Sequence, residues 1–237
     1  MSFKGKPPAG DVRRVRSNGR NIRGVITNKA GRLVQFESWL ERALILRLDR
    51  DPEVLDFQSQ PELFEFIDEQ GKKRSYTPDF KVWRRHGQIE IHEVTLTKRR
   101  VRPDLRRREQ AAREICQERG WQYLVHTEQT LPQGSELVNL LALAGYRPTI
   151  YANQAVVETA FKQLASNRPV RFEVLVKQLE QALNAPEGQI TAALCHLLWH
   201  GELGTDLNQL LFDQGAIVPG VCIWLERKES PNDPPSA

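Results

Sequence analysis

Two acidic residues, Asp79 and Glu93, are spaced so that they could do metal chemistry. Asp79 lies in the segment YTPDF (76–80), and Glu93 follows in EVT after a short turn. On the two-residue period of a strand, Glu93 and Thr95 share a face with two isoleucines, so the carboxylate faces partial burial, which is costly unless a cation compensates. A neighbouring antiparallel strand could bring Asp79 opposite Glu93, and a divalent metal relieves the repulsion between two such acids.

This pair suits the hydrolysis of a phosphodiester. The reaction needs a water of lowered pKa and positive charge beside the phosphorane oxygens, and Mg²⁺ (or Mn²⁺) held by carboxylates supplies both. Glu41, on a helix expected upstream of the pair, is a third acid. The alternative is structural: Asp79 caps a turn after Pro78, and Glu93 pairs with one of the many arginines. The two acids alone leave both interpretations open.

The elements that would position these acids follow from the apolar periodicity. We expect a helix ended by Pro52, then a run of strands, then a basic helix that begins at Pro103 and is closed by Gly120. The expected helices are 37–51, 103–119 and 136–144, and the expected strands are 54–58, 63–67, 74–83, 88–95 and 121–126.

The order of these elements predicts an α/β protein with two domains. Residues 36–148 read as a layered α/β domain. Residues 149–226 carry three helical patterns followed by short strands, which indicates a small winged-helix-like domain. Residues 1–35 are expected to form a basic N-terminal arm, and the polar, proline-rich residues 227–237 a disordered tail.

Positive charge is concentrated in two places. The net charge is only +4, yet residues 1–36 hold nine Lys and Arg against one acid, and residues 96–113 hold eight against two. Such clusters favour a nucleic-acid phosphate backbone as partner, although a solvated helix face is the alternative. The predicted DNA contacts in the second cluster are Arg99, Arg100, Arg106, Arg107 and Arg108.

Several classes of protein are disfavoured. No run of 18 apolar residues exists, so we expect no membrane-spanning helix. Three cysteines without a C-x-x-C motif fit a reducing cytoplasm and argue against a disulfide framework or a cysteine zinc site. His196 and His200 have the spacing of a zinc pair but no evident third ligand, so packing or surface roles are favoured.

Four motifs occur in an order that resembles a known family. They are FESWLE (36–41), DPEVLDFQSQP (51–61), YTPDF (76–80) and IHEV (91–94). Together they resemble the TnsA-like transposase endonucleases over about residues 20–130. The resemblance implies a restriction-endonuclease-like core, a mixed sheet flanked by helices, that nicks double-stranded DNA at transposon ends. It also implies a bacterial, nucleoid-associated cytoplasmic protein.

The resemblance further implies partners and residue roles. A DDE transposase subunit would make the complementary cuts, and an AAA+ transposition regulator would be a further partner; no membrane is involved. Glu41 matches the family's helix glutamate, Asp79 its central aspartate and Glu93 its next metal-site position. Gln60 matches a Gln-Pro pair to which we assign no mechanism.

One position departs from the pattern. The motif has a lysine two residues after the third acid, where this chain has Thr95. That lysine would orient the attacking water and stabilise the charge of the transition state. Lys81, in strand phase with Asp79, or Lys98, just past the acidic strand, could substitute, and the choice leans towards Lys98.

Three hypotheses follow. The chain is an active, metal-dependent transposase endonuclease, a catalytically weak or inactive DNA-binding scaffold of the same machinery, or a winged-helix DNA-binding regulator with an unrelated N-terminal half. The three acids favour the first hypothesis over the second. The weakly basic C-terminal helices count against the third and favour a protein partner for that domain.

Overall fold

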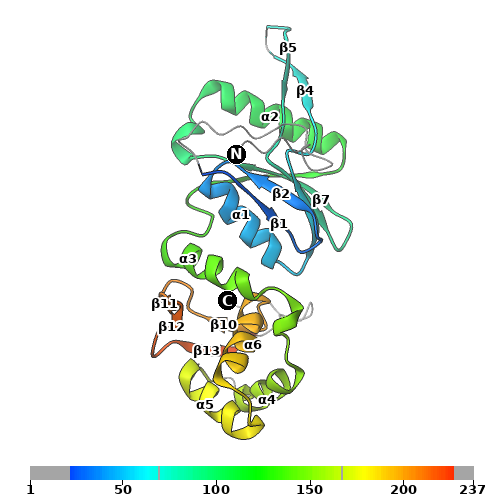
Figure 1. Cartoon of the computed structure of the whole chain (residues 1–237). Helices are drawn as coiled ribbons and strands as arrows, with labels where there is room; N and C mark the ends of the chain where they lie inside the picture. The colour runs from blue at the N-terminus through cyan, green and yellow to red at the C-terminus, as the bar shows by residue number, and fades with distance from the viewer. Residues whose placement is uncertain (1–21, 69, 167, 227–237) are drawn as a thin grey trace, which may run out of the picture. The chain divides into compact units, whose positions relative to one another are not determined.

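The computed structural model describes residues 22–68, 70–166 and 168–226. The chain divides into two compact units between Pro132 and Gln133 (Figure 1). Both helices and strands are present, with six α-helices among the described residues, so the protein is mixed α/β as expected. The predicted tail at 227–237 and most of the predicted basic arm lie outside the described residues.

A four-stranded mixed sheet forms the centre of the first unit. Its order is β3-β6-β7-β8, with β3, β6 and β7 antiparallel and β8 parallel to β7. The unit contains β1 (Gly24–Thr27), β2 (Leu33–Phe36), α1 (Trp39–Arg50), β3 (Val54–Ser59), β4 (Phe64–Ile67), β5 (Lys73–Tyr76), β6 (Phe80–Arg84), β7 (Ile89–Val94), η1 (Thr97–Arg99), α2 (Pro103–Glu118) and β8 (Gln122–His126).

Helix α2 connects the two parallel strands and covers one face of the sheet. A parallel pair needs such a crossover, since no tight turn can join its ends. The helix packs through Ala112 and Cys116 onto Ile91 of β7 and Tyr123 of β8, with Phe64 at the margin. Because Ile91 and Glu93 lie two residues apart on β7, they share the face that α2 covers.

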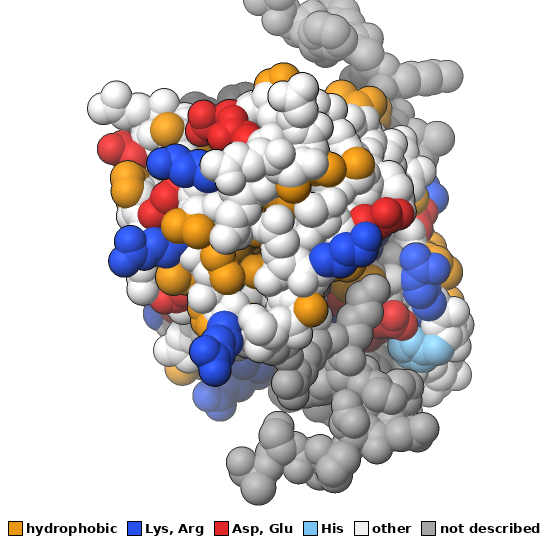
Figure 2. Space-filling view, turned by 90° about the horizontal axis from the view of Figure 1, so that it is seen from below, with side chains coloured by type: hydrophobic (Ala, Val, Ile, Leu, Met, Phe, Trp, Pro, Cys, Tyr) orange, Lys and Arg blue, Asp and Glu red, His pale blue; other side chains and the backbone are white. Residues whose placement is uncertain are grey.

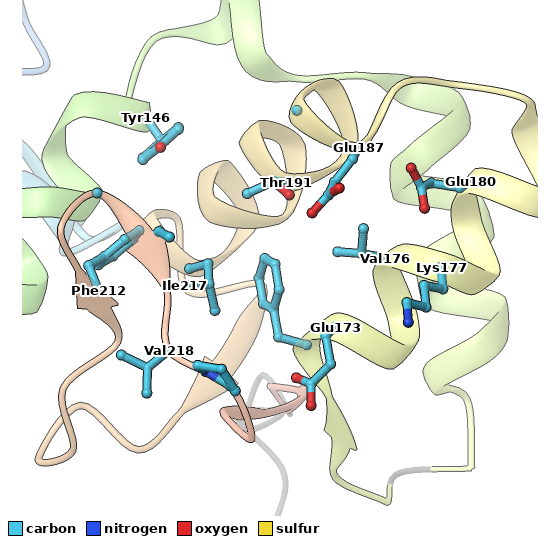
Figure 3. A pocket seen from close by; sticks show the side chains of 15 residues that line it. Tyr146, Glu173, Val176, Lys177, Glu180, Glu187, Thr191, Phe212, Ile217 and Val218 are labelled. Atoms are coloured by element: carbon cyan, nitrogen blue, oxygen red, sulfur yellow. The ribbon is translucent and has the colours of Figure 1, made fainter.

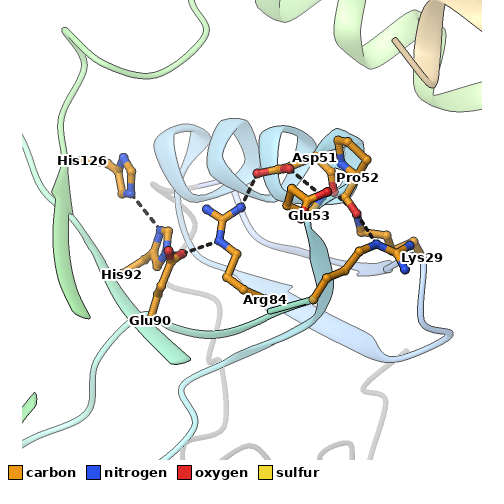
Figure 4. A network of polar contacts seen from close by, with 9 residues as sticks. Lys29, Asp51, Pro52, Glu53, Arg84, Glu90, His92 and His126 are labelled. Atoms are coloured by element: carbon orange, nitrogen blue, oxygen red, sulfur yellow. Dashed lines mark hydrogen bonds and ion pairs between the residues drawn. The ribbon is translucent and has the colours of Figure 1, made fainter. Parts of the chain in front are cut away.

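A chain of charged and imidazole groups lies on the opposite side of β7 (Figure 4). Arg84 bonds two acids. Its Nη1 donates to Asp51 at the end of α1, and its Nε donates to Glu90 Oε2 at 2.9 Å. Glu90 in turn accepts from His92 Nε2 at 2.9 Å, and His92 Nδ1 lies 2.9 Å from His126 Nε2, with the two rings stacked. This network ties α1, β6, β7 and β8 together.

One strand prediction for the first unit is wrong. The strand expected over 74–83 is broken into β5 and β6 at residues 77–79, because Pro78 has no N–H to continue a ladder. In the part of the predicted arm that the structure describes, short extended segments pair as a hairpin, β1–β2. That hairpin is held on β3 because Asn28 Nδ2 donates to Asp56 Oδ1 at 2.8 Å and to Phe57 O at 3.0 Å.

The second unit is mainly helical with a small sheet of order β10-β13-β9. It contains α3 (Gly134–Leu143), η2 (Ala144–Tyr146), η3 (Thr149–Tyr151), α4 (Gln154–Leu164), β9 (Val170–Arg171), α5 (Phe172–Leu183), α6 (Glu187–Trp199), β10 (Leu203–Thr205), β11 (Phe212–Asp213), β12 (Ala216–Ile217) and β13 (Cys222–Leu225). Within the described residues, no helix is both long and apolar enough to span a bilayer.

Helix α3 belongs to this second unit, whereas the sequence placed it in the first. The reason is Asn139, which is fully buried. Its amide nitrogen donates to Leu207 O and Gln209 O at 2.9 and 2.7 Å, and its oxygen accepts from Leu211 N at 2.9 Å. A buried amide with all these bonds made fixes α3 to the loop before β11, because breaking them would leave polar groups unsatisfied.

The paired histidines give a testable pH dependence. Burial, helped by the charges of His92 and Arg47, lowers the pKa of His126 to about 4 from its ordinary 6.5. Between these two pH values the folded chain therefore binds fewer protons than the unfolded chain. The contribution of neutral His126 to the free energy of unfolding is complete above pH 6.5 and is lost as the pH falls towards 4. Relative to His126→Phe, the wild type should lose about 2 kcal/mol of unfolding free energy over that range, allowing for partial exposure. Urea unfolding at pH 7 and pH 4.5 measures this, and parallel changes in the two proteins would contradict it.

Candidate active site

The break between β5 and β6 places Asp79 and fixes it at two points. Its carbonyl oxygen accepts from Gln60 N–H at 2.8 Å, and its Oδ2 accepts from Val94 N–H at 2.7 Å. The first bond anchors Asp79 to the end of β3 and the second to the end of β7. Gln60 thus fixes the main chain of Asp79 and Val94 fixes its carboxylate, both through backbone N–H groups at the ends of two strands of the central sheet.

The turn between β6 and β7 brings Glu93 beside Asp79. Gly87 in this turn has φ 86°, a left-handed conformation that favours glycine, and the strands pair with Phe80 opposite His92. Continuing this register by one residue sets Asp79 against Glu93, as the sequence predicted. Glu93 is only 3% exposed.

An arginine of α2 approaches the buried Glu93 carboxylate. Arg108 Nη2 donates to Glu93 Oε1, while Glu93 Oε2 is buried with no hydrogen-bond partner among the described residues. The guanidinium of Arg108 also lies over the ring of Tyr76, 4.9 Å from its centroid. The sequence had placed Arg108 among the DNA contacts. It had also given pairing of Glu93 with an arginine as the structural alternative, and Arg108 is that arginine.

Glu41 lies in the first turn of α1, and its negative charge acts electrostatically on Asp79 and Glu93. Its N–H donates to Ser38 Oγ at 3.1 Å, and its carboxylate accepts from Ser38 Oγ at 2.9 Å and from Glu37 N–H at 2.8 Å. This is a close relative of the capping box, which explains why α1 begins at Trp39. The carboxylate is therefore directed to the end of its own helix.

The three acids nevertheless act on one another electrostatically. Desolvation, followed by the negative charges of Glu93 and Glu41, raises the pKa of Asp79 well above its ordinary value. Desolvation raises the pKa of Glu93 to about 7, against the opposing charge of Arg108. Acids in this state hold a proton near neutral pH, and a bound cation would displace that proton.

The donor set fits a hard divalent cation. Asp79 and Glu93 offer carboxylate oxygens, Glu93 Oε2 has no other partner, and Mg²⁺ is commonly held by one or two carboxylates together with water and substrate phosphate. Among the described residues, no three acidic, histidine or cysteine side chains already stand in a metal-binding arrangement.

The two lysines considered as substitutes at the centre are placed elsewhere. Lys81 Nζ bonds Glu62 Oε1 at 2.9 Å and lies 3.9 Å from the centroid of the Trp121 ring. Lys98 is exposed in η1 and lies near enough to Glu128 to act on it electrostatically. Thr95 extends the ladder beyond β7 by donating its N–H to His126 O at 3.0 Å.

The other predicted DNA contacts are mostly exposed. Arg99, Arg106 and Arg107 are open to solvent at η1 and α2, and the latter two also donate to backbone carbonyls. Arg100 is paired with Glu109 at 3.0 Å, so part of its charge is balanced within the protein. Their role in DNA binding stays a prediction.

Gln60 is a site residue whose geometry the sequence did not reveal. It has φ 44°, a left-handed conformation that is unfavourable for a residue other than glycine and is further restricted by the following proline. Its N–H holds Asp79, and its side-chain Oε1 is buried with no partner among the described residues. Backbone strain of this kind is often found where a functional group must be held in place. The Gln-Pro pair was the only signal in the sequence.

One known family resembles part of the chain. Residues 51–128 match the family model described as the TnsA-like endonuclease N-terminal domain. This stretch includes Asp79, Glu93, Thr95 and Arg108, while Glu41 lies upstream of it. A search of curated proteins gave no match to the chain.

The raised pKa of Glu93 predicts how a neutral replacement behaves. Between pH 4.5 and about 7 the carboxyl ionises in the unfolded chain but stays protonated in the folded chain, so the acid weakens folding as the pH rises. Without divalent metal, Glu93→Gln should exceed the wild type by about 3 kcal/mol of unfolding free energy at pH 8 and match it at pH 4.

Adding Ca²⁺ should narrow that gap, because the cation stabilises only the ionised acid. Chemical unfolding with and without Ca²⁺ measures both effects. Glu114→Gln, which changes an exposed glutamate of α2, is the matched control and should show neither. A constant difference between Glu93→Gln and wild type at all pH values would contradict the prediction.

Proposed function

We infer that this chain, whose residues 51–128 belong to the TnsA-like endonuclease N-terminal family, is an endonuclease subunit of a transposase. The observation that carries the inference is the pairing of Asp79 with Glu93 at adjoining strand ends, within the matched residues. Two desolvated acids with raised pKa values are unfavourable in a purely structural role and suitable for holding a cation.

We further propose that the enzyme is Mg²⁺- or Mn²⁺-dependent. Asp79 and Glu93 would hold the ion, with Glu41 adding negative charge from α1. Such an ion, when bound, supplies a water of lowered pKa and counter-charge for the phosphate. The protein's part is to hold Asp79 by the backbone of Gln60 and Val94 and to keep Glu93 in a water-poor site.

The sheet β3-β6-β7-β8 with a helix associated with each face supports a restriction-endonuclease-like core as the scaffold of this centre. The double-stranded substrate would lie against the exposed side chains of Arg99 in η1 and of Arg106 and Arg107 in α2. Transposon ends as substrate, and a DDE transposase as the partner that makes the complementary cuts, complete the proposed function.

Asp79→Ala should abolish metal-dependent nicking, because it removes a proposed ligand of the ion. Single-turnover nicking of transposon-end DNA, with the partner transposase present, measures the effect. Asp68→Ala, which changes an acid of the β4–β5 hairpin bonded to Arg74, is the control and should retain activity. Undiminished cleavage by Asp79→Ala would show that the centre lies elsewhere.

For the second unit we propose a winged-helix-like arrangement that binds protein rather than DNA. Strand β9, helices α5 and α6, and strands β10 and β13 follow one another, with the β11–β12 hairpin between β10 and β13. Helix α6 contains neither Lys nor Arg and is largely buried from Ala193 to Trp199. On the face drawn in Figure 2, basic side chains of the described residues are scattered among acidic and apolar ones and form no continuous patch.

A groove of about 500 Å³ in this unit supports a peptide as the ligand. Apolar side chains of α5 and of the β11–β12 hairpin line it, among them Val176, Phe212 and Ile217 (Figure 3). The charged residues that line the groove are three acids, Glu173, Glu180 and Glu187, and one base, Lys177. An acidic rim repels a phosphate backbone and attracts cations, so we propose that the occupant is an apolar segment of the partner protein flanked by Lys or Arg.

Reversing the rim charge should test this assignment. Glu180→Lys combined with Glu187→Lys should weaken binding of the partner transposase at least about tenfold, since like charges across an interface are repulsive. Two single variants are the controls. Glu158→Lys adds the same charge at an exposed α4 residue outside the groove and should leave binding unchanged, whereas Lys177→Glu makes the groove more acidic and should strengthen binding. Equilibrium binding to the purified transposase is the measurement, and equal affinities for all variants would refute the docking site.

A further inference from the structure

The proposed nuclease centre lacks the positively charged side chain that the family pattern has directly after β7. Where the family pattern has lysine, Thr95 offers only a neutral hydroxyl. Charge that develops on the phosphate during hydrolysis is stabilised by a fixed cation in a water-poor site. The contacts of the two candidate lysines are with other acids: Lys81 pairs with Glu62, and Lys98 acts electrostatically on Glu128.

Arg108 is the cation that lies against the acids. It stands on α2, 15 residues after Glu93 in sequence, and its Nη2 bonds Glu93 Oε1 across the interface of helix and sheet. Its charge opposes the rise in pKa of both Glu93 and Asp79. Neighbouring arginines differ, because Arg100 pairs with Glu109 and Arg102 with Asp104, both within the same basic segment.

The polar atoms that remain on this ion pair are informative. Arg108 Nε and Glu93 Oε2 are both buried with no hydrogen-bond partner among the described residues. One is a donor and the other an acceptor. A buried donor on a guanidinium suits a phosphate oxygen, and a buried carboxylate oxygen suits a metal ion. The ring of Tyr76 beneath the guanidinium limits its movement.

We propose that Arg108 is a catalytic residue that supplies from helix α2 the positive charge which the family pattern takes from a lysine at position 95. In this role the guanidinium contacts the scissile phosphate while a bond forms between the water oxygen and phosphorus and one P–O bond of the strand breaks. The proton of the water passes through solvent to the departing oxygen, so that one new end carries a phosphate and the other a hydroxyl. Arg108 stays protonated throughout and stabilises the charge on the phosphate oxygens. The inference rests on the proposed nuclease function.

Single-turnover nicking with saturating protein and Mg²⁺ tests the proposal. Arg108→Ala and Arg108→Gln should each cut about a hundredfold more slowly, and Gln retains a hydrogen bond to Glu93 without the charge. Arg108→Lys should recover most of the rate. Adding Thr95→Lys to Arg108→Ala should restore activity at least about tenfold, because it returns a cation to the strand position.

Arg113→Ala is the matched control. Arg113 is on the same helix and lies over the ring of Tyr123 at 5.1 Å from its centroid, much as Arg108 lies over Tyr76, but it has no contact with the acids in the described structure. Its replacement should leave the nicking rate within about twofold of wild type. Equal losses in Arg113→Ala and Arg108→Gln would show a packing role for both and overturn the proposal.

Two readouts other than activity separate the remaining explanations. DNA affinity measured in Ca²⁺ should stay within a few-fold of wild type in Arg108→Gln, and Ca²⁺ should still raise its melting temperature. A fall in affinity equal to the fall in rate would make Arg108 a simple backbone contact and overturn its catalytic role. If Asp79→Ala abolishes nicking while Arg108→Gln does not, only the inference about Arg108 is wrong. Full activity of Asp79→Ala would instead reject the proposed centre itself.

Discussion

The repulsion between two neighbouring carboxylates is the constraint on which the described site depends. Asp79 and Glu93 meet because β6 and β7 are joined by a tight turn, and both are removed from water. Two charges in such a place are tolerated only when donors or cations oppose them. The backbone N–H of Val94 donates a hydrogen bond to Asp79, and the guanidinium of Arg108 pairs with Glu93. Beneath them, the Ile91–Tyr123–Cys116 core keeps α2 against the sheet, so that Arg108 can reach the acids.

Elements with strong local signals could be predicted from the sequence. Helix α1 ends where Pro52 predicts, and α2 begins at Pro103 and is followed by Gly120 with φ 69°. The juxtaposition of Asp79 with Glu93 was also predictable, because a short turn between antiparallel strands leaves few registers and alternation decides the face. The break at Pro78 was missed, since apolar alternation continues through it on both sides.

Features that depend on distant contacts could not be predicted. Asn139 places α3 in the second unit through bonds to residues about 70 positions away, and nothing near it in sequence indicates this. Arg108 resembles its neighbours in charge, and what distinguishes it is the packing against the sheet of the helix face that it shares with the buried Ala112 and Cys116. Gln60, with its left-handed backbone, likewise bonds through its N–H to Asp79, which is 19 positions away in sequence. In each case, tertiary packing selects among side chains that local patterns treat alike.

The connection from β7 through α2 to β8 also affects the order in which the first unit can fold during translation. Parallel pairing of β7 with β8 joins residues 32 positions apart, from Glu90↔Gln122 to Val94↔His126, and such nonlocal pairing is slow compared with formation of the β6–β7 hairpin. During synthesis the two acids can come together early, whereas Arg108 reaches Glu93 only after α2 has docked and β8 has emerged to hold it. A ribosome-bound chain lacking β8 thus carries the acidic pair without the stable helix–sheet layer around it. The contact between Arg108 and Glu93 is therefore completed only after the whole first unit has been translated.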